Sequence, residues 1–157
     1  MTKKEIHISF NEYKSIDELL PEDRELAQKA IDAMRTAYAP YSSFHVGAAV
    51  RLCSGHIVTG SNQENAAFPS GLCAERTAMF SAGATYPEDD MISLAIAGGI
   101  KGELSIHPAT PCGSCRQVMA QYQTKSGKPM SILMIGKNVI WKFDRVDDIL
   151  PLIFDTI

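Results

Sequence analysis

The hydrophobic residues of this chain follow two spacings, and each spacing predicts one type of element. Ile6, Ile8 and Phe10 alternate with polar residues, which is typical of a short strand or an extended arm. After Pro21, apolar residues recur every three or four positions, which indicates an amphipathic helix that Pro40 brings to an end. The same patterns along the rest of the chain predict strands at residues 46–53, 56–61, 91–97, 130–135 and 139–143 and helices at residues 21–38, 73–84 and 112–124.

The order of these elements predicts the fold. The first two long strands flank Ser54-Gly55, a turn signal that indicates a hairpin. Met91 to Ala97 is continuously apolar, which is typical of a strand covered on both faces of its sheet. Strands then alternate with helices. The sequence therefore predicts an α/β fold, a three-layer α/β/α sandwich with a mixed sheet of about five strands.

The composition limits the possible partners. A chain of 157 residues with 45% hydrophobic residues is typical of one globular domain. The formal net charge of −3 disfavours a nucleic acid polymer or an anionic membrane surface as a partner. The longest stretch without a charged residue, Thr36 to Val50, is too short and too polar to cross a bilayer, and the N-terminal residues lack the apolar run of a secretory signal. We therefore expect a cytoplasmic protein.

Cysteines in a cytoplasmic protein rarely form structural disulfides, so the four thiols of this chain need another role. Cys112 and Cys115 lie at a predicted helix start, and their spacing lets both sulfurs reach one metal ion. Cys73 lies at another helix start and could supply a third thiolate. Three thiolates leave a tetrahedral zinc ion one open position, which would hold a water of lowered pKa. Glu75 is close enough to move a proton of that water without being a ligand.

Charge balance points to a role for Arg76. Three thiolates on Zn²⁺ leave a net charge of about −1, which opposes ionisation of a bound water. The two helix N-termini and Arg76 are the nearby sources of positive charge. We therefore predict that Arg76 donates hydrogen bonds to one or more of the zinc thiolates. The remaining thiol, Cys53, lies in a predicted strand and is expected to be a small buried apolar residue.

The sequence around these residues resembles a known family. A Cys-x-Glu segment followed by Pro-Cys-x-x-Cys is the signature of zinc-dependent base deaminases. Over a longer stretch, from about Pro21 to Phe154, the chain is similar to the small, three-cysteine, homotetrameric cytidine deaminases. The matching runs are Ala39-Pro40-Tyr41-Ser42, Val46-Gly47-Ala48-Ala49, Asn62-Gln63-Glu64-Asn65, Cys73-Ala74-Glu75-Arg76, Pro111-Cys112-Gly113-Ser114-Cys115-Arg116-Gln117 and Leu150-Pro151-Leu152.

The resemblance implies an activity in pyrimidine salvage. It implies the zinc-dependent hydrolytic deamination of cytidine and deoxycytidine to uridine and deoxyuridine, with release of ammonia. One zinc ion per chain would be held by Cys73, Cys112 and Cys115, and Glu75 would carry protons between the water, N3 of the base and the departing amine. Residues 21–157 would form a single zinc-dependent deaminase domain, and residues 1–20 would be an N-terminal arm outside the match.

The same resemblance implies the substrate contacts. Asn62 and Glu64 would hold the ribose hydroxyls of a free nucleoside. Phe44 would pack against the pyrimidine ring, and the backbone of Ala74 would contact the base. In a homotetramer with active sites near the subunit interfaces, Phe154 would reach the site of a neighbouring subunit. One departure is Phe68, which stands where many members of the family have tyrosine.

Three other interpretations stay open. A thioredoxin-like redox protein would use Cys112 and Cys115 and bind no metal, but it has no role for Glu75. A binding module with a closed structural zinc site would use all four cysteines, so Cys53→Ser should destroy metal binding. A related deaminase could act on a nucleoside antibiotic, a free base or a base in RNA or DNA. The Asn62 and Glu64 pair favours a free nucleoside, and the net charge of −3 disfavours a polymer.

Overall fold

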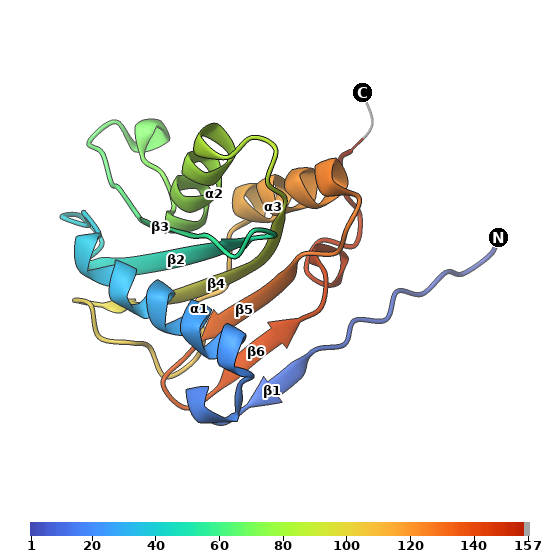
Figure 1. Cartoon of the computed structure of the whole chain (residues 1–157), viewed down its shortest axis with the longest axis horizontal. Coiled ribbons are helices and arrows are strands. Elements are labelled where there is room, and N and C mark those ends of the chain that lie inside the picture. The colour runs from blue at the N-terminus through green and yellow to red at the C-terminus, as the bar shows by residue number, and fades with distance from the viewer. Residues whose placement is uncertain (156–157) are drawn as a thin grey trace.

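The structure of the protein is a computed structural model that describes residues 1–155. Six strands form one sheet, in the order β1-β6-β5-β4-β2-β3 (Figure 1). The strands are β1 (Asn11–Tyr13), β2 (Phe44–Leu52), β3 (Ile57–Ser61), β4 (Met91–Ile100), β5 (Ser131–Ile135) and β6 (Ile140–Phe143). The α-helices are α1 (Pro21–Ala33), α2 (Ala74–Thr85) and α3 (Gly113–Ser126), and the short 3₁₀ helices are η1 (Ile16–Glu18), η2 (Met34–Thr36), η3 (Phe68–Ser70) and η4 (Val146–Asp148).

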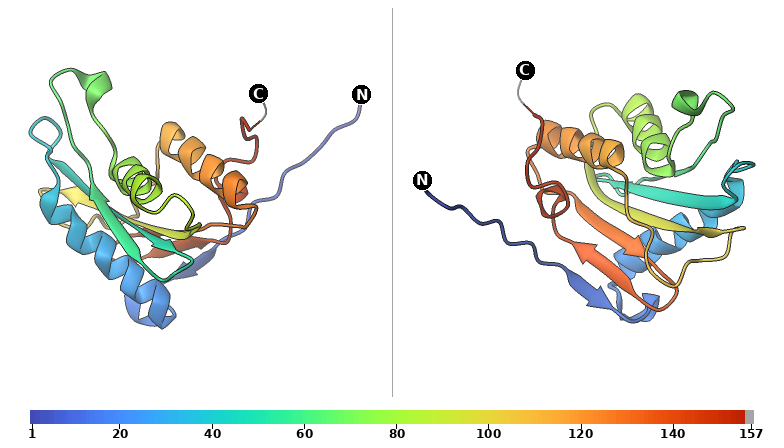
Figure 2. Two further views of the ribbon diagram at one scale, coloured as in Figure 1. Left: turned by 45° about the horizontal axis from the view of Figure 1, so that its top comes forward. Right: turned by 180° about the vertical axis from the view of Figure 1, so that it is seen from behind.

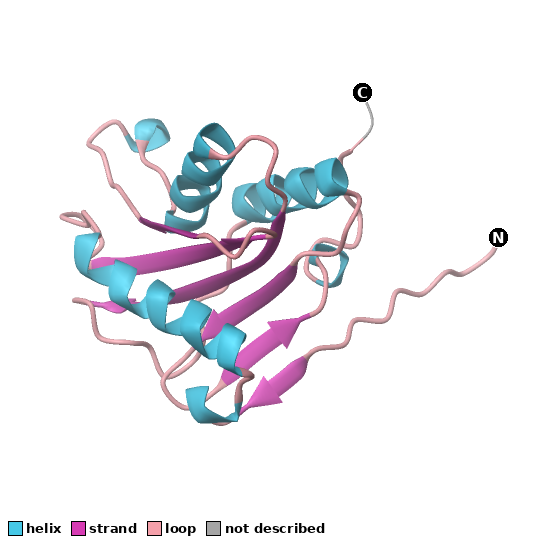
Figure 3. Ribbon diagram, in the orientation of Figure 1, coloured by secondary structure: helices cyan, strands magenta, loops and turns pink. Residues whose placement is uncertain are grey.

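The layers are those predicted from the sequence. Helix α1 covers one face of the sheet, and α2 and α3 lie side by side on the other (Figures 2 and 3). Strands β4 and β5 are parallel, whereas the other neighbouring pairs are antiparallel, so the sheet is mixed. The three-layer α/β/α fold is thus confirmed. The sheet has six strands where about five were expected, and the additional strand is β1.

Strand β1 forms later in the chain than the alternating pattern predicts. Of the two forms predicted for Ile6 to Phe10, a short strand or an extended arm, the arm is the one found, and residues 1–10 run exposed away from the sheet (Figure 1). The reason is the length of the partner strand, because Asn11 already pairs with Lys142, one residue before β6 ends. One apolar residue of the arm, Phe10, still packs against the sheet. The ring of Phe10 packs against Phe143, with ring centroids 4.9 Å apart.

Strand β4 divides the core in two because its alternate side chains face opposite layers. Leu94 and Ile96 pack with α2 and α3, whereas Ala95 and Ala97 pack with α1. All four side chains are buried, so the prediction that both faces of this apolar strand are covered is confirmed. Burial on this scale contributes about 25 cal/mol per Å² of apolar surface, which holds both helix layers to the sheet.

Two glycines let the helices approach the sheet closely. A Cβ atom on Gly47 would lie 2.1 Å from the carbonyl oxygen of Ala30 in α1. On the opposite face, a Cβ atom on Gly60 would lie 2.4 Å from the backbone nitrogen of Ala78 in α2. Real Cβ atoms do not make such short contacts, so glycine at these positions sets the distance between the layers. The contact at Gly60 fixes the position of α2 and of the residues at its N-terminus.

Cys53 is not the buried strand residue that the sequence predicts. It is exposed and lies beyond the end of β2. The pairing of β2 with β4 shifts register between Arg51 and Leu52, and the carbonyl of Leu52 then accepts a hydrogen bond from the amide of Gly55 at 2.9 Å. The turn therefore begins one residue earlier than expected. Cys53 falls within it instead of in the sheet.

Candidate active site

Two of the three predicted zinc ligands occupy helix N-caps. Cys73 caps α2 and Cys112 caps α3, and both have extended backbone conformations. Neither side chain makes a capping hydrogen bond to its own helix, so both thiols are free to turn toward each other. Cys115 lies in the first turn of α3 and is fully buried. Three thiols from two helix starts thus meet above the sheet.

The spacing of the sulfur atoms fits one tetrahedral metal ion. The Sγ atoms of Cys73 and Cys112 are 4.0 Å apart, those of Cys112 and Cys115 are 3.5 Å apart, and all three lie within 4.8 Å of one another. Thiolates bound to zinc at its usual distance of about 2.3 Å lie about 3.8 Å apart in a tetrahedron. The donor set therefore fits zinc with one coordination position left. Cys53 is not part of this group, so the four-cysteine arrangement does not form.

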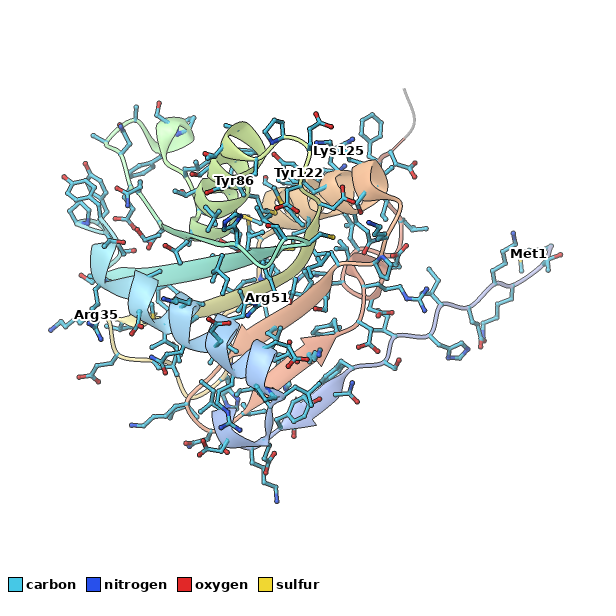
Figure 4. All side chains as sticks on the ribbon, in the orientation of Figure 1. Met1, Arg35, Arg51, Tyr86, Tyr122 and Lys125 are labelled. Atoms are coloured by element: carbon cyan, nitrogen blue, oxygen red, sulfur yellow. The ribbon has the colours of Figure 1, made fainter. Side chains whose placement is uncertain are left out.

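Helices α2 and α3 contact each other near their C-terminal ends, far from the thiols. Tyr122 of α3 packs against Gly83 of α2, where a Cβ atom would lie 2.4 Å from the tyrosine oxygen. Lys125 Nζ donates a hydrogen bond to the carbonyl of Pro87, just after α2, at 2.6 Å. Figure 4 shows Tyr86, Tyr122 and Lys125 at this junction. The two helices that carry the thiols are therefore held in a fixed relation.

Arg76 lies beside the thiols, as the charge argument predicts. Its Nη2 donates a hydrogen bond to Sγ of Cys73 at 3.6 Å. The pKa of Cys73 is lowered to about 5, first by a hydrogen bond with Cys115 and then by Arg76 and Cys112. The pKa of Cys115 is raised because its proton is shared with Cys73 and because the thiol is buried. Of Cys73 and Cys115, Cys73 is thus the thiol that loses its proton more readily, and the Arg76 guanidinium stabilises its charge.

Glu75 lies between the two helix starts. It belongs to the first turn of α2, and only 4% of its surface is exposed. Burial is the main cause that raises the pKa of its carboxyl, and the charge of Cys73 raises it further. A carboxyl with a raised pKa next to metal ligands has the properties of a general acid and base.

A cavity of about 440 Å³ opens beside the thiols. A volume of this size is typical of small-molecule sites. Asn62 and Glu64 line it together with Cys73 and Arg76, so the predicted sugar-binding residues and the predicted metal site share one space. The other lining residues are Tyr41, Gln63, Asn65, Phe68, Gly71 and Leu72.

Asn62 directly follows β3 and uses part of its side-chain amide to hydrogen-bond the backbone of β2. Its Oδ1 accepts a hydrogen bond from the amide of Val46 at 2.7 Å, and its Nδ2 donates to the carbonyl of Phe44 at 2.9 Å. An asparagine amide has two N–H donors, so one donor is left over for a ligand in the cavity. The side chain is therefore fixed in orientation before any substrate binds.

Glu64 receives hydrogen bonds from the loop that leads into β2. Its Oε2 accepts from the backbone amides of Tyr41 and Ser42 at 2.8 Å and 3.3 Å, and its Oε1 accepts from the hydroxyl of Ser42. These hydrogen bonds, with that from the Ser42 side chain first, lower the pKa of the Glu64 carboxyl. The carboxylate is therefore ionised and oriented near neutral pH.

The remaining predicted contacts are more dispersed. Phe44 begins β2, and its ring lies over Gly98 of β4, where a Cβ atom would be 3.1 Å from Cε1 of the ring. Ala74 is fully buried at the first position of α2. Phe154 is 69% exposed, and its carbonyl accepts a hydrogen bond from Nε2 of Gln117 at 2.6 Å. None of these three residues lines the cavity of its own chain.

Residues without an assigned role also shape the site. Tyr41 and Phe68 flank the cavity with ring centroids 5.8 Å apart, and Ser42 hydrogen-bonds Glu64. The run Ala39-Pro40-Tyr41-Ser42 marked this loop as a matching segment. It did not reveal that the loop contacts a residue more than twenty positions further along the chain.

Comparisons with known proteins agree with this geometry. Residues 20–128 match the family described as the cytidine and deoxycytidylate deaminase zinc-binding region. A cytidine deaminase from Halalkalibacterium halodurans is 44% identical over 98 residues, which cover 61% of this chain and 68% of that protein. A blasticidin-S deaminase from Bacillus cereus is 27% identical over 133 residues, or 83% of this chain and 91% of that protein.

A solved structure is also similar. The crystal structure of a cytidine deaminase from Burkholderia pseudomallei superposes with a TM-score of 0.70 at 36% sequence identity. The match covers 83% of this chain and 97% of the other. The zinc-binding region that the family comparison identifies includes all three clustered thiols.

Proposed function

The chain belongs to the cytidine and deoxycytidylate deaminase family, and from this premise we propose how its residues carry out the zinc-dependent hydrolysis of cytidine and deoxycytidine. The reaction replaces the 4-amino group of the base with oxygen and gives uridine or deoxyuridine and ammonia, a step of pyrimidine salvage. The observation that carries the proposal is a cluster of three thiols beside a cavity that also contains Asn62 and Glu64. One site thus offers a metal centre for the base and polar groups for the sugar.

Cys73, Cys112 and Cys115 are the ligands that we assign to one zinc ion per chain. Zinc bound there supplies a water molecule of lowered pKa as the nucleophile. Arg76 offsets part of the negative charge of the thiolates through its hydrogen bond to Cys73. The dipoles of α2 and α3 act in the same direction, because both helices begin at ligand residues.

Glu75 is the proton carrier. It accepts a proton from the attacking water, delivers it to N3 of the base and then helps to protonate the departing amine. Its raised pKa suits this double task, because a carboxyl that titrates closer to neutrality both accepts and returns a proton readily. General acid–base catalysis of this kind contributes about 10²–10⁴ in rate.

The substrate is held through its sugar and its base. Asn62 donates its remaining N–H to a ribose hydroxyl, and Glu64 accepts a hydrogen bond from one. Phe44 packs against the pyrimidine ring, and the backbone of Ala74 contacts the base. These contacts require a sugar with free hydroxyls, so we propose a free nucleoside as the substrate. The net charge of −3 supports this choice over a nucleic acid strand or a membrane surface.

We further propose that the chain forms a homotetramer in which Phe154 reaches the site of a neighbouring subunit. Two of the places where large apolar side chains are exposed are the tail, where Leu152 and Phe154 are 81% and 69% exposed, and the cavity rim, where Tyr41 and Phe68 are 55% and 75% exposed. Exposed apolar patches are often interaction sites. Covering the rim of one chain with the tail of another would remove both patches from water.

We place the reaction in the cytoplasm, because the three thiols have to stay reduced to bind a metal ion. Within residues 1–155, no helix has the length and apolar character needed to cross a membrane.

The test follows the loss of cytidine absorbance while zinc per chain is measured on the same sample. We expect turnover of cytidine and deoxycytidine at a zinc content near one per chain. A zinc content near one per chain without turnover of either nucleoside would refute the proposed substrate but would still support the proposed metal site. Blasticidin S is a useful comparison, because a preference for it would place the chain with the antibiotic deaminases.

A further inference from the structure

The hydroxyl group of Ser42 lies between Phe44, the first residue of β2, and Glu64, in the loop that follows β3. It donates a hydrogen bond to Oε1 of Glu64, and it accepts one from the backbone amide of Phe44 at 3.0 Å. A serine hydroxyl has a single hydrogen. Because the amide of Phe44 is a donor only, the hydrogen of Ser42 has to point at Glu64. The direction of this hydrogen bond is therefore fixed by the start of β2.

The loop around Ser42 is itself held from both sides. The amide of Ser43 donates to the carbonyl of Ala39 at 3.0 Å, and the carbonyl of Ser43 accepts from the amide of Lys101 at 2.7 Å. Ser43 has a φ of 55°, in the left-handed region that residues other than glycine rarely adopt. Such a conformation persists only where the surroundings hold it. The hydroxyl of Ser42 is thus presented to Glu64 by a well-defined loop.

Glu64 has room for one more donor. A carboxylate offers about four lone-pair positions. Three are taken by the amides of Tyr41 and Ser42 and by the Ser42 hydroxyl. Glu64 also lines the cavity, so a donor in the cavity can reach its carboxylate. The three donors therefore leave one acceptor position of the carboxylate for a ligand.

We propose that Ser42 is a positioning residue, which orients the Glu64 carboxylate so that its last acceptor position meets a sugar hydroxyl of the nucleoside. This role rests on the proposed function, because it assigns a substrate group to Glu64. The Ser42 side chain is also the main cause of the lowered pKa of Glu64, which keeps the carboxylate charged. Hydrogen bonds to charged groups contribute more to binding free energy than hydrogen bonds between neutral groups. They depend on geometry, so they weaken when the acceptor is free to rotate.

The role gives Ser42→Ala a specific kinetic signature. The variant removes one of the three donors and frees Glu64 to rotate, so binding through the sugar should weaken. We expect kcat/KM for cytidine to fall about tenfold, mainly through KM. We assign the 2′- or 3′-hydroxyl to Glu64, so for 2′,3′-dideoxycytidine, which keeps only the 5′-hydroxyl, we expect a change of less than about twofold. Ser42→Thr keeps a hydroxyl and should restore most of the activity on cytidine.

The matched control is Ser81→Ala, which removes the hydroxyl of an exposed serine in α2 that does not line the cavity, and it should leave turnover of both substrates unaffected. Ser42 is exposed, so its replacement should not unfold the chain, and an unchanged zinc content checks this. Equal losses on cytidine and dideoxycytidine, or no loss on cytidine, would overturn the role of Ser42 alone. Absence of cytidine turnover in the unmodified zinc-loaded protein would instead refute the proposed function and this role with it.

Discussion

Arg76 donates a hydrogen bond from Nη2 to Sγ of Cys73 at 3.6 Å, across the first turn of α2. The contact places a permanent positive charge on a site that three thiolates would make negative. A histidine ligand would reduce the same negative charge by binding as a neutral group. In this chain the ligands are all cysteines, so the compensation comes from a residue that binds a ligand instead of the metal.

Replacing Arg76 should therefore change the pH dependence of the reaction. Loss of the positive charge stabilises the protonated forms of the site, which raises the pKa of the group that must lose a proton before the attack. We expect Arg76→Gln to move the acidic limb of the kcat/KM profile toward higher pH, and Arg76→Lys to move it less. A profile measured from pH 5 to 9 checks this. An acidic limb that stays in place in Arg76→Gln would rule out the compensation.

The thiols should differ in their effect on metal content. Cys115 is buried within the cluster of three, whereas Cys53 is exposed in a turn outside it. We expect Cys115→Ser to lose zinc and Cys53→Ser to keep it near one per chain, as measured by metal analysis after gel filtration. Loss of zinc from Cys53→Ser would favour a closed structural site in place of the open one.

The close contact at Gly60 should be sensitive to a single methyl group. A Cβ atom there would lie 2.4 Å from the backbone of Ala78, so α2 would have to move. We expect Gly60→Ala to lower the free energy of unfolding by about 2 kcal/mol, which denaturant titration can measure. Gly113→Ala is the control, because a Cβ atom on Gly113 would have no neighbour within 4 Å. Equal stability of the two variants would show that the layers can separate without cost.

The exposed arm should be dispensable for the chemistry. The family match begins at residue 20, and every residue that lines the cavity lies at or beyond Tyr41. We propose that residues 21–157 form a single zinc-dependent deaminase domain. Removal of residues 1–9 should thus leave the zinc content and kcat/KM within about twofold of the full chain. A large loss of either in the truncated chain would mean that the arm contributes to the site or to the assembly around it.

The sequence predicted the parts of this site that depend on local spacing. The interval between Cys112 and Cys115 and the position of Glu75 two residues after Cys73 already imply which side chains can share a metal ion. The layers of the fold followed equally from the apolar character of residues 91–97. These features depend on residues that are neighbours along the chain, so they can be predicted from local spacing and periodicity in the sequence.

Features that depend on pairing between distant segments were not predictable in the same way. The burial of Cys53 was predicted wrongly because a register shift at Leu52 is invisible in the alternation of residues. The helix that starts at Pro21 was expected to reach Tyr38, but it tightens to a 3₁₀ turn after Ala33, where the hydroxyl of Thr36 bonds to the carbonyl of Ala33 at 3.0 Å. The contact between Ser42 and Glu64 likewise joins two loops that only the folded sheet brings together.

The most direct test of the account is Glu75→Gln, measured for zinc content and cytidine turnover on the same preparation. The amide keeps the size of the carboxyl in its buried position but cannot carry a proton. We predict zinc near one per chain and turnover reduced by at least about 10²-fold, with Glu75→Ala behaving alike. Retention of more than roughly a few per cent of the unmodified rate by the zinc-loaded variant would contradict the assignment of Glu75 as the proton carrier.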